Sequence, residues 1–396
     1  MKSITSKELG KALCAVLVLA LFAPTALAYP PDNAAVLYYR ASLLYNEDSA
    51  IQDKLHDLLK GKTEIDEEIT DYVIKRNASA IKYFVDAGDA PQCDWGLDYS
   101  EGYLLVLPHY ATLRNLARIV LADAKIAAKA GDYKLALDRC LSVHKMATHL
   151  GGDILIAHLV AMASNTMANE CIVDILSQMP ADAEVLTWLK TELAKTSTQM
   201  SALRTALSLE KKCGYMAMRV EKRDELLALL AGTENGGDVD EQARERLTEA
   251  DEAFFDRSRE YFINHMNRLD ELLSSSLSYA GLYEQLKQLG EKPGKEATKN
   301  NDAVLTAFLA PALSRVCTID TKSRNYFGAI AAALDIYILK AKTGRLPNNL
   351  PAGVPKDLFS GKDFEYEKTK GGFVLRCRGK DLDKDEIYQY EFKVSE

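Results

Sequence analysis

Apolar side chains recur at intervals of three and four residues along most of the chain, which is the spacing of helices that bury one face. The longest regular run covers residues 113–128, and Gly131-Asp132 separates it from a second run over 133–150. A third helix is expected to open at Asp153, after two further glycines. Because short turns between long helices produce antiparallel neighbours, this region predicts an antiparallel helical bundle or an array of helical hairpins.

Three other segments show the same periodicity. Helices are expected over 33–44, over 183–230 and from 241 towards 289. Polar residues dominate 232–240 and 291–301, so both of these segments are predicted to be linkers.

The pattern changes after residue 325. A helix over 326–342 is expected to end at Gly344, with Gly371-Gly372 as the turn of a later hairpin. Three runs alternate apolar and polar residues as strands do, namely 364–369, 373–378 and 387–394. The sequence therefore predicts a mainly α protein with a helical domain over 29–320 and a small C-terminal α+β module over 321–396, built from a helix and three antiparallel strands.

The first 28 residues are typical of a cleavable signal peptide. Lysines precede an apolar run over 12–23, and the small residues Ala26-Leu27-Ala28 follow it. The run is shorter than the roughly 20 apolar residues of a spanning helix, and no later stretch is long enough to cross a bilayer. We therefore expect cleavage after Ala28 and a mature protein that is exported to the periplasm or the extracellular space, with no membrane span.

Charge and cysteine content narrow the function only slightly. The chain has a formal net charge of −8, and removal of residues 1–28, with their three lysines and one glutamate, makes it −10. This balance gives no electrostatic footprint for nucleic acid. The expected partner is another exported or envelope protein. Of the seven cysteines, six lie beyond residue 28. The sequence leaves two alternatives for them, disulfide bonds or buried free thiols.

The turn between the two most regular helices resembles a known repeat. The residues Gly131-Asp132-Tyr133-Lys134-Leu135-Ala136 are similar to the junction between the helices of a tetratricopeptide repeat. Asp123 and Thr148 depart from that family's pattern, and no second copy follows at a 34-residue interval. The resemblance implies one helical hairpin of this style.

The C-terminal module resembles the periplasmic part of type II secretion pseudopilins. The matching residues are Gly344-Arg345-Leu346-Pro347, the run from Pro355 to Gly361, and Phe364-Glu365-Tyr366. The resemblance implies a helix, a loop and paired strands, with calcium bound nearby. The family's methylation motif and long assembly helix are absent, so it does not imply pilus assembly.

The whole chain is similar to a group of uncharacterised exported bacterial proteins of planctomycete type. The residues that carry this similarity are 33–39, 93–99 and the hairpin helix that ends in His149-Leu150. The resemblance implies export and a helical fold, and it brings no activity with it.

Cys140, His144 and His158 are a candidate zinc site. A chain reversal at Gly151-Gly152 would bring the two histidines to the same level of antiparallel helices, with the thiol one turn from His144. Two imidazoles and a thiolate leave the fourth zinc position open to water, as catalytic zinc requires. The alternative is ordinary packing, because a cysteine on an apolar helix face is commonly a core residue.

Asp94, Asp98 and Glu101 are a candidate catalytic set. They lie in a segment with Trp95 and Tyr99, and paired carboxylates beside aromatic rings suit a glycosidase subsite. The alternative is a loop rich in turns whose tryptophan fills a gap in the helical body.

Asp381, Asp383 and Asp385 are candidate calcium ligands, in line with the resemblance to pseudopilins. Glu386 occupies the sixth position of the run, where an EF-hand has glycine. The alternative is a solvated turn between strands.

The chain contains neither a Gly-x-Ser-x-Gly nucleophile motif nor a phosphate-binding glycine loop. No cofactor is expected. The favoured hypothesis is a non-enzymatic, exported helical binding or scaffold protein. The alternative is a hydrolase or metal-dependent enzyme with its site near Cys93 to Glu101 or near His144 and His158.

Overall fold

The computed structural model describes residues 32–105, 107–196, 200–231 and 244–395. The predicted leader, residues 1–28, lies outside the described residues, and so does the predicted linker over 232–240. The fold is mainly helical, at 70% helix, with a small three-stranded antiparallel sheet, which confirms the predicted fold class. No described helix combines the length and the apolar character that are needed to cross a membrane.

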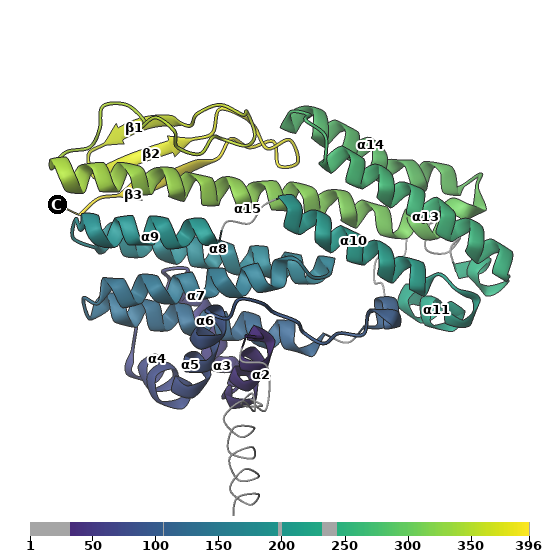
Figure 1. Cartoon of the computed structure of the whole chain (residues 1–396), viewed down its shortest axis with the longest axis horizontal. Coiled ribbons are helices and arrows are strands. Elements are labelled where there is room, and N and C mark those ends of the chain that lie inside the picture. Colours follow the sequence, from purple (N-terminus) through teal and green to yellow (C-terminus); the bar gives the residue numbers. More distant parts are fainter. Residues whose placement is uncertain (1–31, 106, 197–199, 232–243, 396) are drawn as a thin grey trace, which may run out of the picture.

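The N-terminal half forms stacked layers of helices (Figure 1). Short helices pack beneath the long antiparallel hairpin of α6 and α7, and α8 and α9 cover the other side of that hairpin. The elements are α2 (Ala34–Leu44), α3 (Ser49–Leu59), α4 (Glu67–Asp71), η1 (Tyr72–Arg76), α5 (Ala78–Gly88), η2 (Tyr99–Leu104), α6 (Pro108–Lys129), α7 (Tyr133–Gly151), α8 (Leu155–Gln178) and α9 (Ala183–Lys195).

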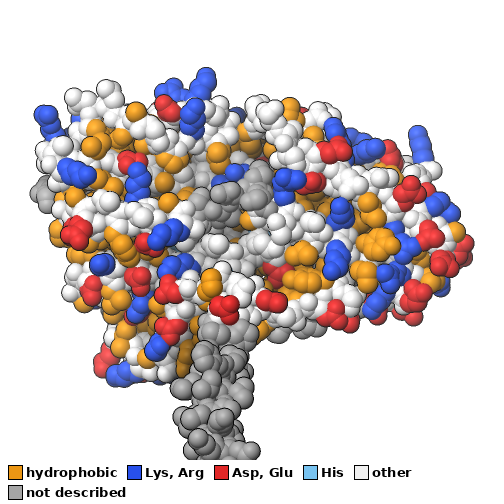
Figure 2. All heavy atoms as spheres, viewed as in Figure 1, with side chains coloured by type: hydrophobic (Ala, Val, Ile, Leu, Met, Phe, Trp, Pro, Cys, Tyr) orange, Lys and Arg blue, Asp and Glu red, His pale blue; other side chains and the backbone are white. Residues whose placement is uncertain are grey.

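The second half adds another group of helices and the sheet, joined by the long helix α15 (Figure 1). These elements are α10 (Met200–Ala217), η3 (Val220–Lys222), α11 (Arg223–Ala231), α13 (Glu252–Leu273), α14 (Tyr279–Ala297), η4 (Asn301–Ala303), α15 (Val304–Thr343), β1 (Glu365–Thr369), β2 (Gly372–Arg376) and β3 (Gln389–Lys393). On the face shown in Figure 2, acidic and basic side chains are interspersed, with hydrophobic side chains in small groups among them.

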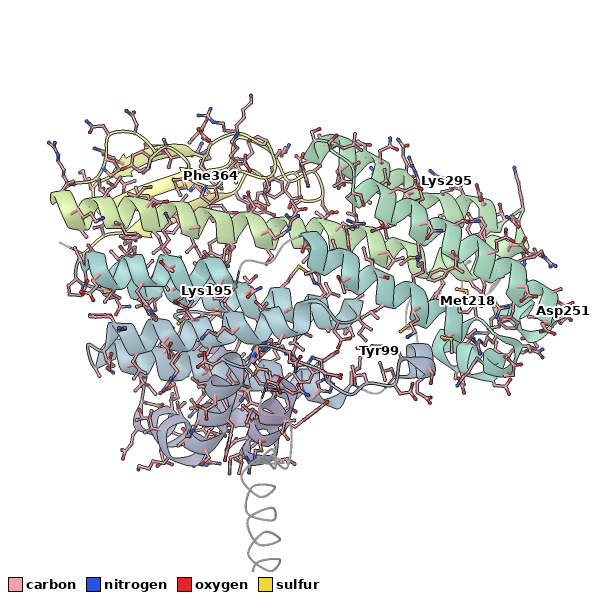
Figure 3. All side chains as sticks on the ribbon, in the orientation of Figure 1. Tyr99, Lys195, Met218, Asp251, Lys295 and Phe364 are labelled. Carbon is pink, nitrogen blue, oxygen red and sulfur yellow. The ribbon has the colours of Figure 1, made fainter. Side chains whose placement is uncertain are left out.

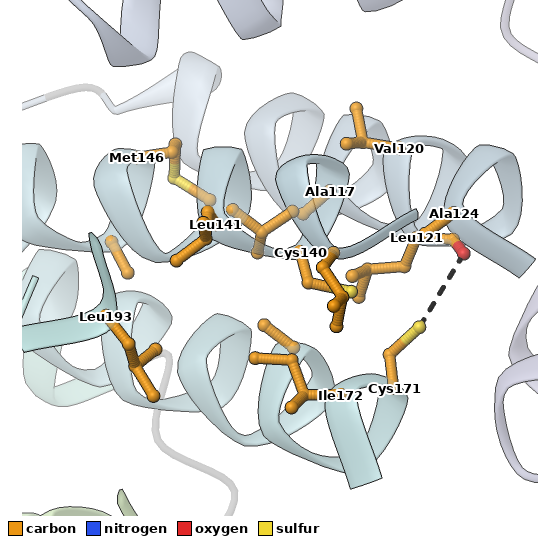
Figure 4. Packing of buried hydrophobic residues seen from close by; sticks show 14 of the residues in the cluster. Ala117, Val120, Leu121, Ala124, Cys140, Leu141, Met146, Cys171, Ile172 and Leu193 are labelled. Atoms are coloured by element: carbon orange, nitrogen blue, oxygen red, sulfur yellow. Dashed lines mark hydrogen bonds between the residues drawn. The ribbon is translucent and has the colours of Figure 1, made fainter. Parts of the chain in front are cut away.

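The predicted hairpin of helices is present as α6 and α7. Asp132 caps α7 by accepting a hydrogen bond from the backbone N–H of Leu135 at 3.1 Å, and Gly131 adopts the positive φ of 85° that the turn requires. Small residues on α6 and the thiol of Cys140 allow these helices to pack closely (Figure 4). The third helix, α8, begins at Leu155 and not at Asp153, whose carboxylate is buried instead.

Two predictions for the middle of the chain are wrong. The helix expected from 241 towards 289 is interrupted between α13 and α14, where Ser278 caps α14. The segment 291–301, predicted as a linker, is mostly the last part of α14, followed by η4. Its polar composition suggested a linker, but Gly290, Pro293 and Ala297 belong to a buried stripe of α14. Small residues in this stripe allow α14 to pack closely on α15.

The helix expected over 326–342 is the second half of α15, a helix of 40 residues that is about 60 Å long. It ends as predicted at Gly344, which has a left-handed φ of 74°. The domain boundary predicted between 320 and 321 lies inside this helix. The sheet and the second half of α15 share one hydrophobic cluster with α2 to α9, which we call the first cluster. The first half of α15 belongs to a second cluster with α10, α13 and α14.

The three predicted strands form an antiparallel sheet in the order β1-β2-β3. Phe373 of β2 pairs with Lys368 on one side and with Phe392 on the other. The hairpin turn is formed by Lys370 and Gly371, one residue earlier than predicted, because Gly372 already pairs in the ladder. A Cβ atom at Gly372 would collide with the backbone of Phe392, so this strand position requires glycine.

We expect Leu375→Ala to lower the free energy of unfolding by about 2–5 kcal/mol, because Leu375 is fully buried in the first cluster and its truncation leaves a cavity. Urea denaturation followed by fluorescence of Trp95 and Trp188, which pack in the helical part of the same cluster, should report the loss.

A matched control is Ile387→Ala, because that side chain is 52% exposed and its removal should change stability by less than about 1 kcal/mol. An unchanged midpoint of tryptophan fluorescence in Leu375→Ala would show that the sheet and the helices unfold independently.

Candidate functional site

The middle of α15 is polar although it is buried. On either side of it, α15 buries apolar residues in the two hydrophobic clusters. Between them, residues 318–325, which we call the junction segment, bury Thr318, Asp320, Thr321 and Asn325. Buried polar groups are costly unless they are hydrogen-bonded, so the partners of these side chains determine how the neighbouring elements are placed.

Asp320 is fully buried and lies between Arg324 and His158. Arg324 donates from Nε to one carboxylate oxygen at 2.6 Å, and His158 of α8 lies with Nε2 3.0 Å from the other. The Nδ1 atom of His158 lies 2.8 Å from the carbonyl oxygen of Gly151. Both ring nitrogens of His158 therefore face hydrogen-bond acceptors. Burial would raise the pKa of Asp320, but the hydrogen bonds from His158 and Arg324 outweigh it and hold that pKa below its ordinary value.

Asn325 attaches the C-terminal module to the junction segment. Its Oδ1 accepts from the backbone N–H of Leu358 at 2.7 Å, and its Nδ2 donates to the hydroxyl of Tyr390 at 3.2 Å. The loop that carries Leu358 is organised by the buried Asp357, which accepts from the backbone N–H groups of Phe359, Arg378 and Gly379. The loop is therefore fixed against α15 at one side of the junction segment.

Two adjoining cavities open along another side of the junction segment, and we call them together the α15 groove. Their volumes are about 360 and about 370 Å³, and Thr318 and Asp383 line both. The first has an apolar floor from α8 and α15 and tyrosine rings from the C-terminal module, comprising Leu159, Met162, Ala163, Ile319, Tyr326, Tyr388 and Tyr390. The second lies between α14 and α15, from Tyr283 and Ala307 to Arg315.

The rim of the α15 groove is mainly cationic. Lys322 lies over the ring of Tyr388, 4.5 Å from its centroid. Three other cations line the groove, namely Lys287, Arg315 and Lys384. None of the four forms a salt bridge within the described residues. Of the three lining carboxylates, Glu291 is paired with Lys295 at 2.6 Å and Asp381 accepts hydrogen bonds from Tyr388 and Asp383. Asp383 forms no salt bridge within the described residues, so four unpaired cations face one unpaired carboxylate. The groove thus combines an apolar floor with unpaired positive charge.

The three candidate calcium ligands do not converge. Asp381 is buried, and its carboxylate accepts from the hydroxyl of Tyr388 at 2.6 Å and from the backbone N–H of Asp383 at 2.9 Å. The Asp383 and Asp385 side chains are exposed, and Asp385 pairs with Lys380. Asp381 therefore organises a tight turn, which is closed by an antiparallel β-bridge between its backbone and that of Glu386. Its carboxylate already accepts hydrogen bonds from donors of the protein itself.

The three candidate zinc ligands also have separate partners. Cys140 lies in the apolar core near Cys171 (Figure 4), and the Nδ1 atom of His144 lies 2.8 Å from Oδ1 of Asn165. Because α8 begins only at Leu155, the residue of α8 level with His144 is Asn165, two turns beyond His158. In the part of the chain that the structure describes, no three His, Cys, Asp or Glu side chains are arranged to hold a metal ion. All six cysteines described there are free.

The candidate catalytic carboxylates stabilise turns. Asp94 accepts from the backbone N–H of Gly96 at 2.9 Å, and Asp98 accepts from that of Ser100 at 3.0 Å and caps η2. Hydrogen bonds from Ser100 lower the pKa of Asp98. Glu101 is exposed. The carboxylate that lies beside the aromatic residues of this segment therefore comes from elsewhere in the fold.

Trp95 is 6% exposed and stacks between Tyr38 and His109, with ring centroids 5.6 and 4.9 Å apart. The carboxylate beside these aromatic residues is Asp153, which accepts from the hydroxyls of Tyr99 and Tyr110 at 2.5 and 2.6 Å. Tyr99 stands on the segment that crosses to α10 (Figure 3), so Asp153 fastens that segment to the helical body.

The residues of the junction segment were missed by the sequence prediction. The only signal is the polar run over 318–325, which lies where the change of pattern placed a domain boundary and does not itself indicate a buried cluster. Asp153 was expected to cap a helix, and its burial depends on two tyrosines that are distant in the sequence.

Comparisons with family models, with curated proteins and with solved structures gave no match to this chain. The similarities to tetratricopeptide repeats, to pseudopilins and to exported planctomycete proteins therefore stay predictions from the residues quoted above.

We expect Asp320→Ala to lower the free energy of unfolding by about 3–5 kcal/mol, because it leaves the largely buried charge of Arg324 without its anion and the ring of His158 without its acceptor. Urea denaturation at neutral pH measures the change. The control is Glu271→Ala, which breaks an exposed pair with Arg268 and should cost less than about 1 kcal/mol. A similar small loss in Asp320→Ala would contradict the charged cluster.

Stability should also fall in mild acid because of His144. Burial lowers the pKa of this histidine to about 4, whereas an unfolded histidine titrates near 6.5. Between these values the unfolded chain binds a proton that the folded chain excludes, so the free energy of unfolding falls as the pH falls. From about pH 6.5 to about pH 5 this residue should contribute a loss of about 2 kcal/mol.

The test is urea denaturation of His144→Gln, which removes the titrating ring, at both pH values. This variant should lose less stability on acidification than the wild type does. The exposed His56 gives the matched control, since His56→Gln should keep the full loss. Equal acid sensitivity of the wild type and His144→Gln would show that the histidine does not cause it.

Proposed function

We propose that the mature protein is a non-enzymatic, exported binding protein, and that its α15 groove holds an acidic segment, with interspersed apolar side chains, of another exported or envelope protein. The observation that carries this proposal is the combination of an apolar floor with four unpaired cations in a chain whose net charge is −8. Such a groove attracts negative charge and rewards the burial of apolar side chains.

The shape of the groove supports a chain segment as its occupant. The lining residues on α15 extend from Ala307 to Tyr326, a rise of about 28 Å along the helix. An extended peptide of about eight residues covers that distance. Compact ligands would fill only one of the two adjoining cavities, so the continuous groove favours an extended partner.

The floor of the groove offers apolar contacts at two depths. Ile319 is 38% exposed, while Leu159 and Met162 lie deeper, on α8. If an apolar side chain of the partner covers Ile319, binding gains about 25 cal/mol of free energy for each Å² of apolar surface that is removed from water. Lys322 and Lys384 lie at the rim, where acidic side chains of the partner meet them. No contact of the described residues favours the alternative of a hydrolase or metal-dependent enzyme.

The proposal is tested with fluorescent octapeptides of alternating leucine and glutamate, or of alternating leucine and lysine. Fluorescence anisotropy should show binding of the acidic peptide in the micromolar range and no binding of the basic one. Raising the salt concentration should weaken binding, because exposed charges are screened.

Two rim substitutions, Lys322→Glu and Lys384→Glu, should each weaken binding of the acidic peptide about tenfold, which corresponds to about 1.4 kcal/mol. Ile319→Asp should also weaken binding of the acidic peptide, because it places a negative charge in the apolar floor of the groove. Lys342→Glu is the matched control, since Lys342 is an exposed lysine of α15 that does not line the groove. Equal binding of both peptides, or equal effects of Lys322→Glu and Lys342→Glu, would refute the proposal.

A further inference from the structure

A separate cavity of about 260 Å³ lies on another side of the junction segment, between α8, α15 and the loop that holds Pro355 and Leu358. We call it the Arg324 cavity. Its walls are fixed, because Asn325 accepts a hydrogen bond from the backbone of Leu358 and the buried Asp357 holds the rest of the loop. It shares only Ser323 with the first cavity of the α15 groove.

Both ionic side chains that line the Arg324 cavity, within the described residues, are cations. These are Arg324 and Lys356, and Lys356 forms no salt bridge there. The Arg324 guanidinium is held in place by the hydrogen bond from its Nε to Asp320. That contact uses one edge of the guanidinium and leaves terminal N–H groups to donate to a ligand in the cavity.

Asp320 is shared between Arg324 and a second partner. One carboxylate oxygen accepts from Nε of Arg324, and the other lies 3.0 Å from Nε2 of His158, so Asp320 does not serve Arg324 alone. The Arg324 side chain is 18% exposed, and its charge is therefore poorly solvated. An oxyanion in the cavity would balance this charge, and Lys356 would add a second cation at its edge.

The opposite wall is apolar, with the Phe327 ring and the side chains of Pro355 and Leu358. Gly328 lies close to this wall, since a Cβ atom there would already contact the Cβ of Pro355 at 3.5 Å, so a larger side chain at this position would take up space in the cavity. A cavity of this volume suits a ligand smaller than most drug-sized molecules. The lining therefore favours a small molecule with one anionic group and an apolar body.

We propose that the Arg324 cavity binds a small organic anion whose carboxylate or phosphate contacts Arg324 and Lys356 and whose apolar body packs against Phe327 and Pro355. This site is independent of the peptide proposed for the α15 groove, and either proposal can fail without the other.

The test uses titration calorimetry at constant ionic strength with four probes, namely phenylacetate, phenyl phosphate, inorganic phosphate and the neutral benzyl alcohol. Phenylacetate or phenyl phosphate should bind with a Kd of about 1 mM or tighter, and the stronger of the two identifies the anionic group. Benzyl alcohol should bind at least about tenfold more weakly, because it lacks the charge. Inorganic phosphate should also bind more weakly, because it lacks the apolar body.

Lys356→Gln should weaken binding about tenfold without disturbing the fold, because Lys356 is exposed and lies outside the buried cluster. Gly328→Leu should abolish binding by filling the cavity. Lys342→Gln, at the far end of α15, is the matched control and should bind like the wild type.

No heat of binding with either aromatic anion at about 10 mM would overturn the proposal. So would equal affinity for benzyl alcohol, equal affinity for inorganic phosphate, or unchanged affinity in both Lys356→Gln and Gly328→Leu.

Discussion

The carboxylate of Asp320, buried in the middle of a 40-residue helix, is the constraint on which the arrangement of this molecule depends. A buried charge is tolerated only with close partners of opposite charge, so α8 must present His158 at one level of α15, and Arg324 must turn back along its own helix. His158 is fixed in turn by the carbonyl of Gly151, at the end of α7. One ionic cluster thus sets the register of α7, α8 and α15.

The same polar stretch explains why the cavities gather around the middle of α15. Apolar side chains cannot cover Asp320 and Asn325 without leaving their polar atoms unpaired, so each hydrophobic cluster ends before the junction segment. Polar atoms of α8 and of the C-terminal loops take the place of a continuous apolar core there. The gaps left by this less regular packing are the α15 groove and the Arg324 cavity, both bounded by residues of the junction segment.

The sequence predicted the elements that depend on local patterns and missed those that depend on distant partners. Helix α7 with its Asp132 cap and the three strands follow from periodicity and turn residues. The buried polar cluster around residues 318–325 was missed, because nothing local shows that Asp320 meets His158, 162 residues earlier. The candidate zinc ligands lie apart for the same kind of reason, since the length of the turn after α7 places Asn165, not His158, beside His144.

The carboxylates of this acidic chain explain why its candidate sites are cationic. Asp153 was expected to open a helix and Asp381 to bind calcium, yet these two carboxylates and that of Asp357 are buried, and each accepts several hydrogen bonds from tyrosine hydroxyls or backbone N–H groups. Such carboxylates hold loops in place and have little capacity left for a ligand. The ionic side chains that line the Arg324 cavity are those of lysine and arginine, and in the α15 groove four cations outnumber the three carboxylates of Glu291, Asp381 and Asp383. A chain with an excess of acidic residues can therefore favour anionic partners, because the position of a charge and its existing hydrogen bonds, and not the net charge, determine what it binds.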